Sequence, residues 1–333
     1  MINIFYETNY AKRKKKIFTF KFQKSVLLNK YIDFSYKYNL IIPDRFITNG
    51  PLKLMNNVIR SLKFEKTSYN KIKYKNNYIL QFDKFGEDAL QKIIENNIKN
   101  SKVLVGPLYT VKQLENLVKY VNSYEFIRIV TASKIAKYNI LNDLNLDIDE
   151  SKFCTLPIGL IEKQKLIYNL KIKTRNERCL VYFKNRENSE LEQVLEFLET
   201  KRIKYDLLQY GNYLNSKLKK LSKKNKFGVV IGSTESQGFA IQEMLLSNLP
   251  LIIWDKNIGN FEEYQINGTT VPYWNDLCGI KVDSIDALIN SFEFFINNLN
   301  KYKPVSLISE QLTFDKFREN LICAFDEIEI DKA

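Results

Sequence analysis

Short runs of β-branched and aromatic residues alternate along the chain with longer stretches whose apolar residues recur at helical spacing. The predicted strands are 38–42, 77–82, 102–105, 125–130, 153–156, 179–183, 205–209, 227–231 and 249–254. The predicted helices are 52–62, 87–98, 111–121, 189–200, 214–222 and 238–247, followed by C-terminal helices. Thr131 or Ser133 is suited to cap a further helix. This alternation predicts α/β domains built on mainly parallel sheets.

Residues 162–178 are polar, rich in Lys and Asn, and without a clear period, so they are the candidate linker between two domains. A chain of 333 residues has the length of two domains at about 150 residues each. We therefore predict an N-terminal domain of residues 1–165 and a C-terminal domain of residues 166–333, with final helices that can pack back on the first. Ligands of open α/β sheets bind at the carboxyl ends of the strands, so the site is expected there.

The chain contains no histidine, which excludes Ser-His-Asp or Cys-His catalysis, His-ligated zinc and an imidazole acid or base. Its four cysteines form no Cys-x-x-Cys pair and are too few for a disulfide framework, which favours a reducing compartment. No apolar run approaches the roughly 18 to 20 residues that span a bilayer. Residues 1–10 lack the layout of a signal peptide. We expect a cytoplasmic protein.

Positive charge is concentrated in the first third of the chain. Residues 1–100 hold 20 of the 51 Lys and Arg residues but only 8 of the 38 Asp and Glu residues. The run Lys12–Lys16 is the densest part. Such a segment is suited to an anionic membrane surface, a nucleic acid or an anionic substrate, and equally to a solvated face. Because Asn, Ile and Tyr are abundant as well, part of the Lys excess is explained by the codon usage of an AT-rich genome.

Residues 227–255 carry the most specific pattern in the chain. A β-like run ends in a polar turn that contains Gly232 and Gly238, and a helix follows. Amide groups at a helix start suit a phosphate or a sugar hydroxyl, and glycine permits close approach of a ligand. Glu235 and Glu243 lie eight residues apart, and carboxylates accept hydrogen bonds from paired hydroxyls. The residues alone are equally consistent with an ordinary helix start that carries one capping and one exposed Glu.

The segment 235–243, followed by 250–254, resembles the Glu-x7-Glu signature of retaining GT-B glycosyltransferases of the "group 1" type. Three other segments resemble parts of the same family in the same order. They are the glycine turn and first helix at 49–60, the helix-to-strand passage at 131–159, and the strand with basic residues at 181–186. The resemblance covers most of residues 48–280. Residues 269–278 also resemble a poorly characterised branch, without chemistry attached to them.

The resemblance implies a GT-B fold, in which two Rossmann-like parallel-sheet domains face each other across a cleft. The N-terminal domain would be the acceptor side, and the C-terminal domain would bind a UDP- or GDP-linked sugar as co-substrate. It assigns catalytic roles to Glu235 and Lys184, and it places Glu243 at the nucleotide ribose. The other residues that it assigns to the donor are Arg186, Gln237, Gly238, Phe239 and Ala240. Independently of the resemblance, the loop 210–213 follows a predicted strand, so Tyr210 and Tyr213 are candidates for contact with the nucleobase. On the acceptor side it assigns Asn49, Gly50, Gly106 and Pro107.

Such enzymes neutralise the leaving diphosphate with basic side chains and a helix N-terminus, so no metal and no other cofactor is expected. The leaving phosphate takes the acceptor proton in the scheme implied for this family, which suits a chain without histidine. Many relatives do place a histidine near the donor sugar, and the loop 106–109 would have to replace it here. The pair Asp147 and Asp149 has the spacing of a metal-binding Asp-x-Asp, but it lies in a helix-to-strand loop instead of ending an apolar strand.

Three functions remain open at this point. The first is transfer of a sugar to a glycan, a lipid-linked sugar or another cell-surface precursor, with peripheral contact to an anionic membrane through Lys12–Lys16. The second is a DNA-base glycosyltransferase that uses the same positive charge, although a nucleic-acid partner is the less favoured expectation. The third is a module that binds a nucleotide or glycan without turnover.

The adjacent Glu262 and Glu263 are expected on a solvated face.

Overall fold

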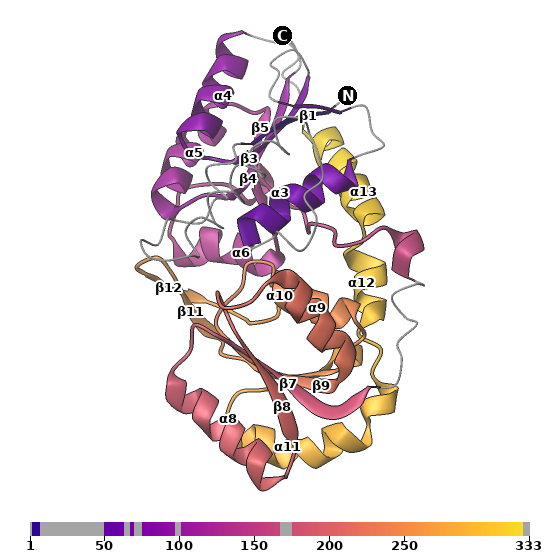
Figure 1. Ribbon diagram of the computed structural model, residues 1–333. Helices are drawn as coiled ribbons and strands as arrows, with labels where there is room; N and C mark the ends of the chain where they lie inside the picture. The colour runs from indigo at the N-terminus through magenta and orange to yellow at the C-terminus, as the bar shows by residue number, and fades with distance from the viewer. Residues whose placement is uncertain are drawn as a thin grey trace, which may run out of the picture. The chain divides into compact units, whose positions relative to one another are not determined.

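The computed structural model describes residues 2–6, 50–62, 67–69, 75–96, 101–166 and 175–328. The predicted strand 38–42, Asn49 and the run Lys12–Lys16 lie outside these ranges. The chain divides into two compact units (Figure 1). Unit 1 comprises Met1–Gly159 and Phe314–Ala333, and unit 2 comprises Leu160–Thr313.

Unit 1 is built on a parallel sheet with the strand order β2-β1-β3-β4-β5-β6 in the part of the chain that is described. These strands are β1 (Ile2–Phe5), β2 (Thr67–Tyr69), β3 (Asn76–Gln81), β4 (Lys102–Leu108), β5 (Ile127–Thr131) and β6 (Phe153–Thr155). β3 is buried along nearly its whole length. Burial on both faces explains why the central strands are continuous apolar runs in the sequence, without alternation.

The α-helices described in unit 1 are α3 (Gly50–Ser61), α4 (Lys84–Glu95), α5 (Val111–Ser123), α6 (Lys134–Tyr138) and α13 (Phe314–Asp326). Side chains cap the N-termini of α4, α5 and α6. The side chain of Ser133 accepts a hydrogen bond from the Ala136 amide, which confirms Ser133 as an N-cap. Thr110 and Gln113 form a capping box at the start of α5.

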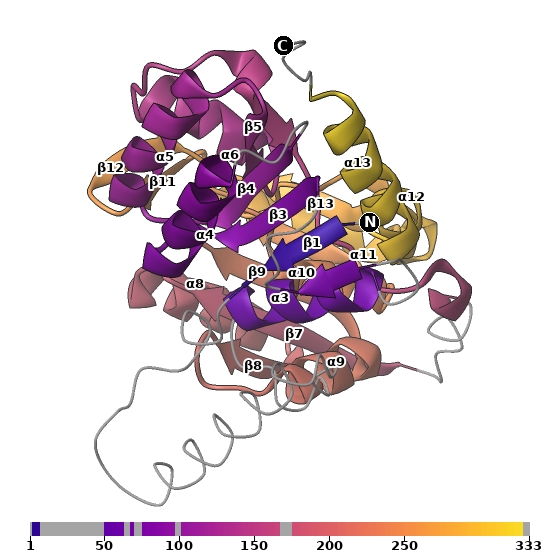
Figure 2. The same cartoon turned by 90° about the horizontal axis from the view of Figure 1, so that it is seen from above.

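The C-terminal helix α13 packs against α3 and β4 (Figure 2). Two long side chains join these elements through backbone carbonyls. Lys102 Nζ donates to the carbonyl of Phe325 at 2.7 Å, and Arg318 Nη1 donates to the carbonyl of Ser61 at 2.8 Å. The chain thus returns to unit 1 after completing unit 2, and its last described helix closes one side of the first sheet.

Unit 2 contains a parallel sheet with the strand order β13-β10-β9-β7-β8. The strands are β7 (Asn176–Lys184), β8 (Lys204–Gln209), β9 (Asn225–Gly232), β10 (Leu251–Trp254) and β13 (Gly279–Val282). The helices are α8 (Asn188–Thr200), α9 (Asn215–Lys224), α10 (Phe239–Leu246), α11 (Ile285–Asn297) and α12 (Val305–Gln311). Each predicted strand and helix between 179 and 254 has a counterpart among them, so this part of the secondary-structure prediction is confirmed.

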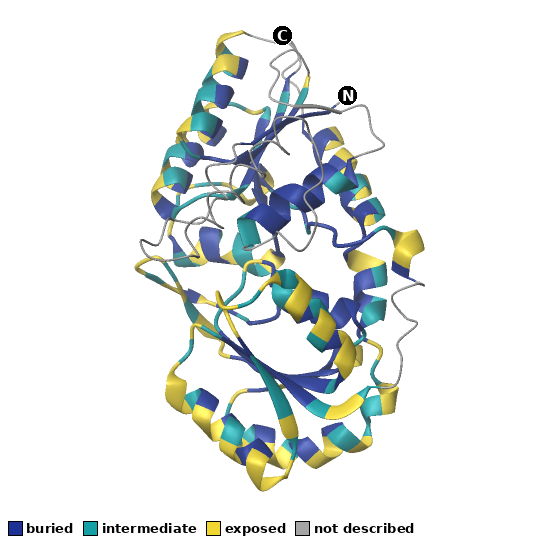
Figure 3. Ribbon diagram, viewed as in Figure 1, coloured by how far each residue is buried: buried dark blue, intermediate teal, exposed yellow. Residues whose placement is uncertain are grey.

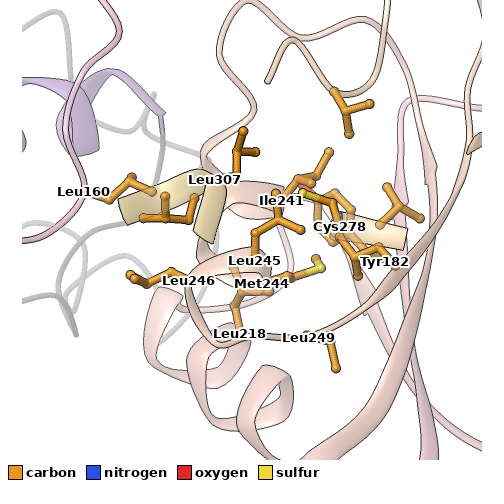
Figure 4. Close-up of a cluster of buried hydrophobic side chains, with 14 of the residues drawn as sticks. Leu160, Tyr182, Leu218, Ile241, Met244, Leu245, Leu246, Leu249, Cys278 and Leu307 are labelled. Carbon is orange, nitrogen blue, oxygen red and sulfur yellow. The ribbon is translucent and has the colours of Figure 1, made fainter. Parts of the chain in front are cut away.

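Helices cover both faces of the unit 2 sheet, and alternate residues of β7 face opposite cores. Cys179, Val181 and Phe183 pack with residues of α8 and α11. Leu180 and Tyr182 pack with residues of α9, α10 and α12, and Figure 4 shows this second cluster around Leu245. The two clusters account for the nearly continuous apolar character of β7.

Two features of unit 2 differ from the sequence-based expectation. β7 begins at Asn176, within the predicted linker, and Arg178 forms an ion pair with Asp206 of β8 at 2.9 Å. The first residues of β7 are polar and exposed, so a search for apolar runs does not detect them as part of a strand. The region after β10 contains an antiparallel hairpin of β11 (Ile258–Phe261) and β12 (Tyr264–Asn267), which is largely exposed (Figure 3). β11 lacks an alternation of apolar and polar residues, and the alternation in β12 covers only four residues, which is too short to predict a hairpin alone.

Within the described ranges, no helix has both the length and the apolar character needed to cross a membrane.

Candidate functional site

The candidate site of unit 2 lies where the neighbouring strands β7, β9 and β10 end. Lys184 is the last residue of β7, Gly232 the last of β9 and Trp254 the last of β10. Because parallel strands present their carboxyl ends at one edge of the sheet, the three following turns are brought together. The Ser233 amide donates to the carbonyl of Lys184 at 3.1 Å, which joins the first two turns directly.

The two residues expected to be catalytic form an ion pair. Lys184 Nζ lies 2.6 Å from Glu235 Oε1, and each side chain is 14% exposed. Lys184 Nζ also lies 4.5 Å from the centroid of the Tyr210 ring, within range of a cation–π interaction. Fixed by a carboxylate and an aromatic ring, the ammonium group is held at the edge of the sheet with some access to solvent.

The turn that carries Glu235 ends at the start of α10. Gly238 is the N-cap residue with φ 77° and ψ 47°, in the left-handed region that favours glycine. No side chain among the described residues caps this helix, so the amides of its first turn are not occupied by a capping group. The positive end of the helix dipole adds to their attraction for an anion. Phe239 and Ala240, both expected at the donor, are the first two residues of α10.

Gln237 is buried next to this turn, and its side chain is directed to the helix. Gln237 Nε2 donates to Gln242 Oε1 at 3.3 Å, and Gln242 Nε2 donates to the Gln237 carbonyl at 2.7 Å. These bonds stiffen the entry into α10. The Gln237 side chain is thus bound to α10, and the donor role of this residue stays a prediction.

Glu243 lies on α10 and is only 2% exposed. Lys219 Nζ of α9 is 3.4 Å from Glu243 Oε2. A buried carboxylate is strongly disfavoured unless a cation or hydrogen-bond donors compensate its charge. Lys219 supplies such a charge, and the sequence did not reveal this role because α9 carries several lysines with similar spacing.

Three tyrosines lie near the end of β7. Tyr213 donates a hydrogen bond to the Tyr182 hydroxyl at 3.4 Å, and the two rings meet edge to face with centroids 6.1 Å apart. Burial raises the pKa of Tyr213 to about 12 and also raises the pKa of Tyr182. Both phenols therefore stay protonated at neutral pH. Tyr210 is 48% exposed, so its ring is accessible for stacking.

Arg186 lies two residues after the end of β7, and its side chain is bound within the unit. Its guanidinium forms a bidentate pair with Glu190, with both distances 2.6 Å. Nη1 also donates to the carbonyls of Gly232 at 3.0 Å and Trp254 at 3.1 Å. Its side chain is 4% exposed. Arg186 thus joins the ends of β7, β9 and β10, and its hydrogen bonds are directed into the unit.

Glu190 holds the Arg186 side chain within the unit through this bidentate pair. Burial raises its pKa, but hydrogen bonds from Arg186 and Lys256 outweigh that effect and hold the pKa of Glu190 at about 2. Lys256 Nζ lies 2.8 Å from Glu190 Oε1. The spacing of Arg186 and Glu190 by four residues was visible in the sequence, and it was the available signal for this internal pair.

The expected acceptor-side residues belong to unit 1. Gly50 is the first residue of α3, and a Cβ at this position would have no atom within 4 Å. Gly106 has φ 123°, and a Cβ there would lie 2.5 Å from the Val130 carbonyl oxygen. Pro107 follows it in β4. Close packing on β5 thus accounts for Gly106, and the acceptor role of these residues stays a prediction.

The other acidic pairs lie in turns. Asp149 caps a short 3-10 helix by accepting a hydrogen bond from the Ser151 amide at 2.7 Å, so it is part of the expected helix-to-strand loop. Glu262 and Glu263 form the exposed turn of the β11–β12 hairpin, which confirms their expected solvated position. In the ranges that the structure covers, no three Cys, Asp or Glu residues gather as metal ligands would.

Comparisons with known proteins give no match to a family model and no match to a curated protein. Several solved structures are similar in fold. A glycosyltransferase from Rickettsia africae ESF-5 shares 14% identity over 98% of each chain, with a TM-score of 0.53. The structure of a GtfA/B complex shares 11% identity over 76% of this chain and 57% of that chain, with a TM-score of 0.50.

A mutant of TarM from S. aureus, in complex with fondaparinux, alpha-GlcNAc-glycerol and UDP, shares 14% identity and has a TM-score of 0.46. That match covers 82% of this chain but only 59% of the S. aureus chain. The two parallel-sheet units and the full-length similarity to the R. africae glycosyltransferase confirm the predicted fold class: this chain has the two-domain α/β architecture of GT-B glycosyltransferases.

Proposed function

We propose that the chain is a glycosyltransferase that moves a sugar from a UDP- or GDP-linked donor to a glycan, a lipid-linked sugar or another cell-surface precursor. One observation carries this proposal. At the carboxyl ends of β7 and β9, Lys184 forms an ion pair with Glu235, and Glu235 lies in the turn that leads into the uncapped N-terminus of α10. The fold shared with the R. africae glycosyltransferase supports it.

The donor diphosphate is placed at Lys184 and the first amides of α10. The ammonium group of Lys184 has three N–H donors, and its one hydrogen bond to Glu235 leaves others for a phosphate. Backbone amides of Phe239 and Ala240, with the helix dipole, add neutral donors and partial positive charge. Together they supply charge neutralisation for a leaving diphosphate, so the proposal needs no divalent cation.

Glu235 and Glu243 are assigned to hydroxyl groups at opposite ends of the donor. Glu235, fixed by Lys184, accepts hydrogen bonds from the transferred sugar. Glu243, whose charge is balanced by Lys219, accepts them from the nucleotide ribose. Tyr210 offers an exposed ring beside Lys184, and Tyr213, which is bound to Tyr182, follows in the same loop, so Tyr210 and Tyr213 are placed near the nucleobase.

The proposed reaction retains the configuration of the sugar. The bond from the anomeric carbon to the phosphate oxygen breaks, and the acceptor oxygen bonds to the same carbon on the same face. The acceptor proton moves to the departing phosphate oxygen, so no enzymic base is required. Lys184 and the α10 amides stabilise the charge that develops on the diphosphate.

The acceptor is assigned to unit 1, where Gly50, Gly106 and Pro107 are candidates together with Asn49. Arg186 is reassigned from donor binding to positioning, because its guanidinium is occupied by Glu190 and two carbonyls. We place the protein in the cytoplasm, with the basic residues Lys12–Lys16 directed to an anionic membrane surface or an anionic acceptor.

A thermal-shift screen over nucleotide sugars tests the proposal, because a ligand that binds only the folded state raises its apparent stability. A UDP- or GDP-sugar is expected to raise the Tm and to release the nucleoside diphosphate when acceptor or water is present. Glu243→Gln should weaken the shift, whereas Glu293→Gln, in an exposed pair with Lys201, should not. The proposal fails if no nucleotide sugar stabilises the protein.

Binding of a nucleotide sugar without release of the nucleoside diphosphate would instead support a non-catalytic module. Binding to duplex DNA that weakens steeply with salt would support a DNA-base glycosyltransferase.

A further inference from the structure

The segment after the β11–β12 hairpin returns to the turn that carries Glu235. The Glu235 amide donates to the Thr269 carbonyl at 3.0 Å. The Thr270 hydroxyl donates to the Gly232 carbonyl at 3.1 Å. These two bonds hold both ends of the four-residue turn 232–235. Residues 269–278 resemble a poorly characterised branch of the family, and no chemical role was attached to them. Two of them, Thr269 and Thr270, thus hold the turn that carries Glu235.

Asp255 fixes the two threonines. It follows β10 directly and is 7% exposed. Its Oδ2 accepts a hydrogen bond from the Thr269 hydroxyl at 2.6 Å, and its Oδ1 accepts one from the Thr270 amide at 2.7 Å. Its own amide donates to the Val282 carbonyl at 2.8 Å, which ties it to β13. Hydrogen bonds to a carboxylate are stronger than neutral ones, so Asp255 is a rigid support.

The base of the hairpin meets the same turn through close packing. A Cβ at Gly259 would lie 1.7 Å from Thr234 Oγ1, and one at Gly268 would lie 2.1 Å from it. Any side chain at either glycine would push Thr234 away, and Thr234 immediately precedes Glu235. The hairpin ends are held together by the Gly268 amide, which donates to the Asn257 carbonyl at 2.9 Å.

We infer that Asp255, Thr269 and Thr270 form a positioning clamp that fixes the backbone of Glu235 for the transfer step. The inference rests on the proposed function for its kinetic consequence. None of the three residues is assigned to the donor, and they act through Glu235. Misplacing a reacting group by about 1 Å lowers the rate by about 10²-fold, so a clamp of this kind affects turnover more than binding.

The kinetic test compares Thr270→Val with Thr270→Ser. Valine keeps the shape but loses the hydroxyl that binds the Gly232 carbonyl, and serine retains that hydroxyl. Thr270→Val should lower kcat about 10- to 100-fold while the Kd for the nucleoside diphosphate changes less than about threefold. Serine should restore most of kcat. Asp206→Ala, which removes an ion pair near the amino ends of β7 and β8, is the control for stability loss without loss of kcat.

Hydrogen exchange in the absence of ligand tests the clamp independently of activity. The Glu235 amide is expected to exchange slowly in the wild type and at least about tenfold faster in Thr270→Val and Asp255→Ala. Faster exchange in a protein that binds no nucleotide sugar would uphold the clamp and refute the proposed function. Unchanged exchange and unchanged kcat in Thr270→Val would overturn the clamp. An equal loss of kcat and nucleotide affinity would also overturn it, because the support would then serve the whole site.

Discussion

Removing the charge of Lys184 gives the most informative perturbation of the candidate site. Lys184→Met keeps the aliphatic stem beside Tyr210 but removes the ammonium group that lies 2.6 Å from Glu235. A hydrogen bond to a charged group contributes about 1.5–3 kcal/mol. Losing one such bond to a phosphate should weaken nucleoside diphosphate binding about 10- to 150-fold. Loss of charge stabilisation in the transition state should lower kcat by about 10²–10³.

Glu235→Gln should act in the opposite direction on binding. The glutamine keeps the shape of the side chain but no longer draws the Lys184 charge toward itself. Nucleoside diphosphate affinity should therefore stay equal to that of the wild type or increase. Turnover should fall at least about tenfold, because the carboxylate that we assign to the donor sugar is lost. The two changes thus separate the diphosphate role of Lys184 from the sugar role of Glu235.

Isothermal titration with UDP and GDP, together with a coupled assay of nucleotide release, measures both effects. Lys201→Met is the matched control, since Lys201 forms an exposed ion pair with Glu293 away from the strand ends. Thermal unfolding of each variant shows whether it remains folded. Wild-type affinity for the nucleoside diphosphate in folded Lys184→Met would refute the reasoning, as would a large loss of that affinity in Glu235→Gln.

Three further predictions concern the support of the site. Gly238→Ala imposes a side chain on a residue with φ 77°, so it should lower the free energy of unfolding by about 1–2 kcal/mol in calorimetry and weaken nucleotide binding in titration, and an unchanged nucleotide affinity would contradict it. Arg186→Met should lower the free energy of unfolding by about 1.5–3 kcal/mol in denaturant melts, because it removes the hydrogen bonds of Arg186 to Glu190 and to two carbonyls while Lys256 still compensates the charge of Glu190, and a loss below about 1 kcal/mol would contradict it. The pKa of Glu190 is held at about 2, below its ordinary 4.5, so its ion pairs stabilise the fold above pH 4.5 and lose this effect as the pH falls toward 2. Glu190→Gln should therefore reduce the dependence of the free energy of unfolding on pH between 4.5 and 2. An unchanged pH dependence in this variant would contradict the role of Glu190.

The sequence predicted the fold class well because parallel α/β architecture depends on local signals. Buried strands are apolar runs, helices are periodic, and Ser133 has the chemistry of an N-cap. The β11–β12 hairpin was not predicted, because β11 has no alternation of apolar and polar residues and the alternation in β12 covers only four residues. The start of β7 was assigned to a linker for the same reason, since Asn176 and Glu177 are exposed.

The site was predicted as single residues, not as an arrangement. Lys184 and Glu235 were both named, but their ion pair joins residues that lie 51 positions apart, on two strand ends that only the sheet order brings together. Arg186 has the same charge as Lys184 and lies two residues away, yet Glu190 turns it into the unit. Nothing local distinguishes the two basic residues except that acidic residue four positions later.

The residues that the sequence did not reveal act through long-range contacts. Asp255 follows a strand, as many surface acids do, and its role depends on threonines 14 and 15 residues later. Lys219 is one of several lysines on α9, and only the packing of α9 against α10 shows which one approaches Glu243. Periodicity cannot supply such contacts, because they are fixed by the packing of elements from different parts of the chain.

The position of the donor diphosphate is the central claim, and a crystal structure of the protein with a bound UDP- or GDP-sugar tests it most directly. Phosphate oxygens are expected within hydrogen-bond distance of Lys184 Nζ and of the Phe239 or Ala240 amides, with the ribose at Glu243. A diphosphate bound elsewhere, with Lys184 still paired only to Glu235, would contradict it.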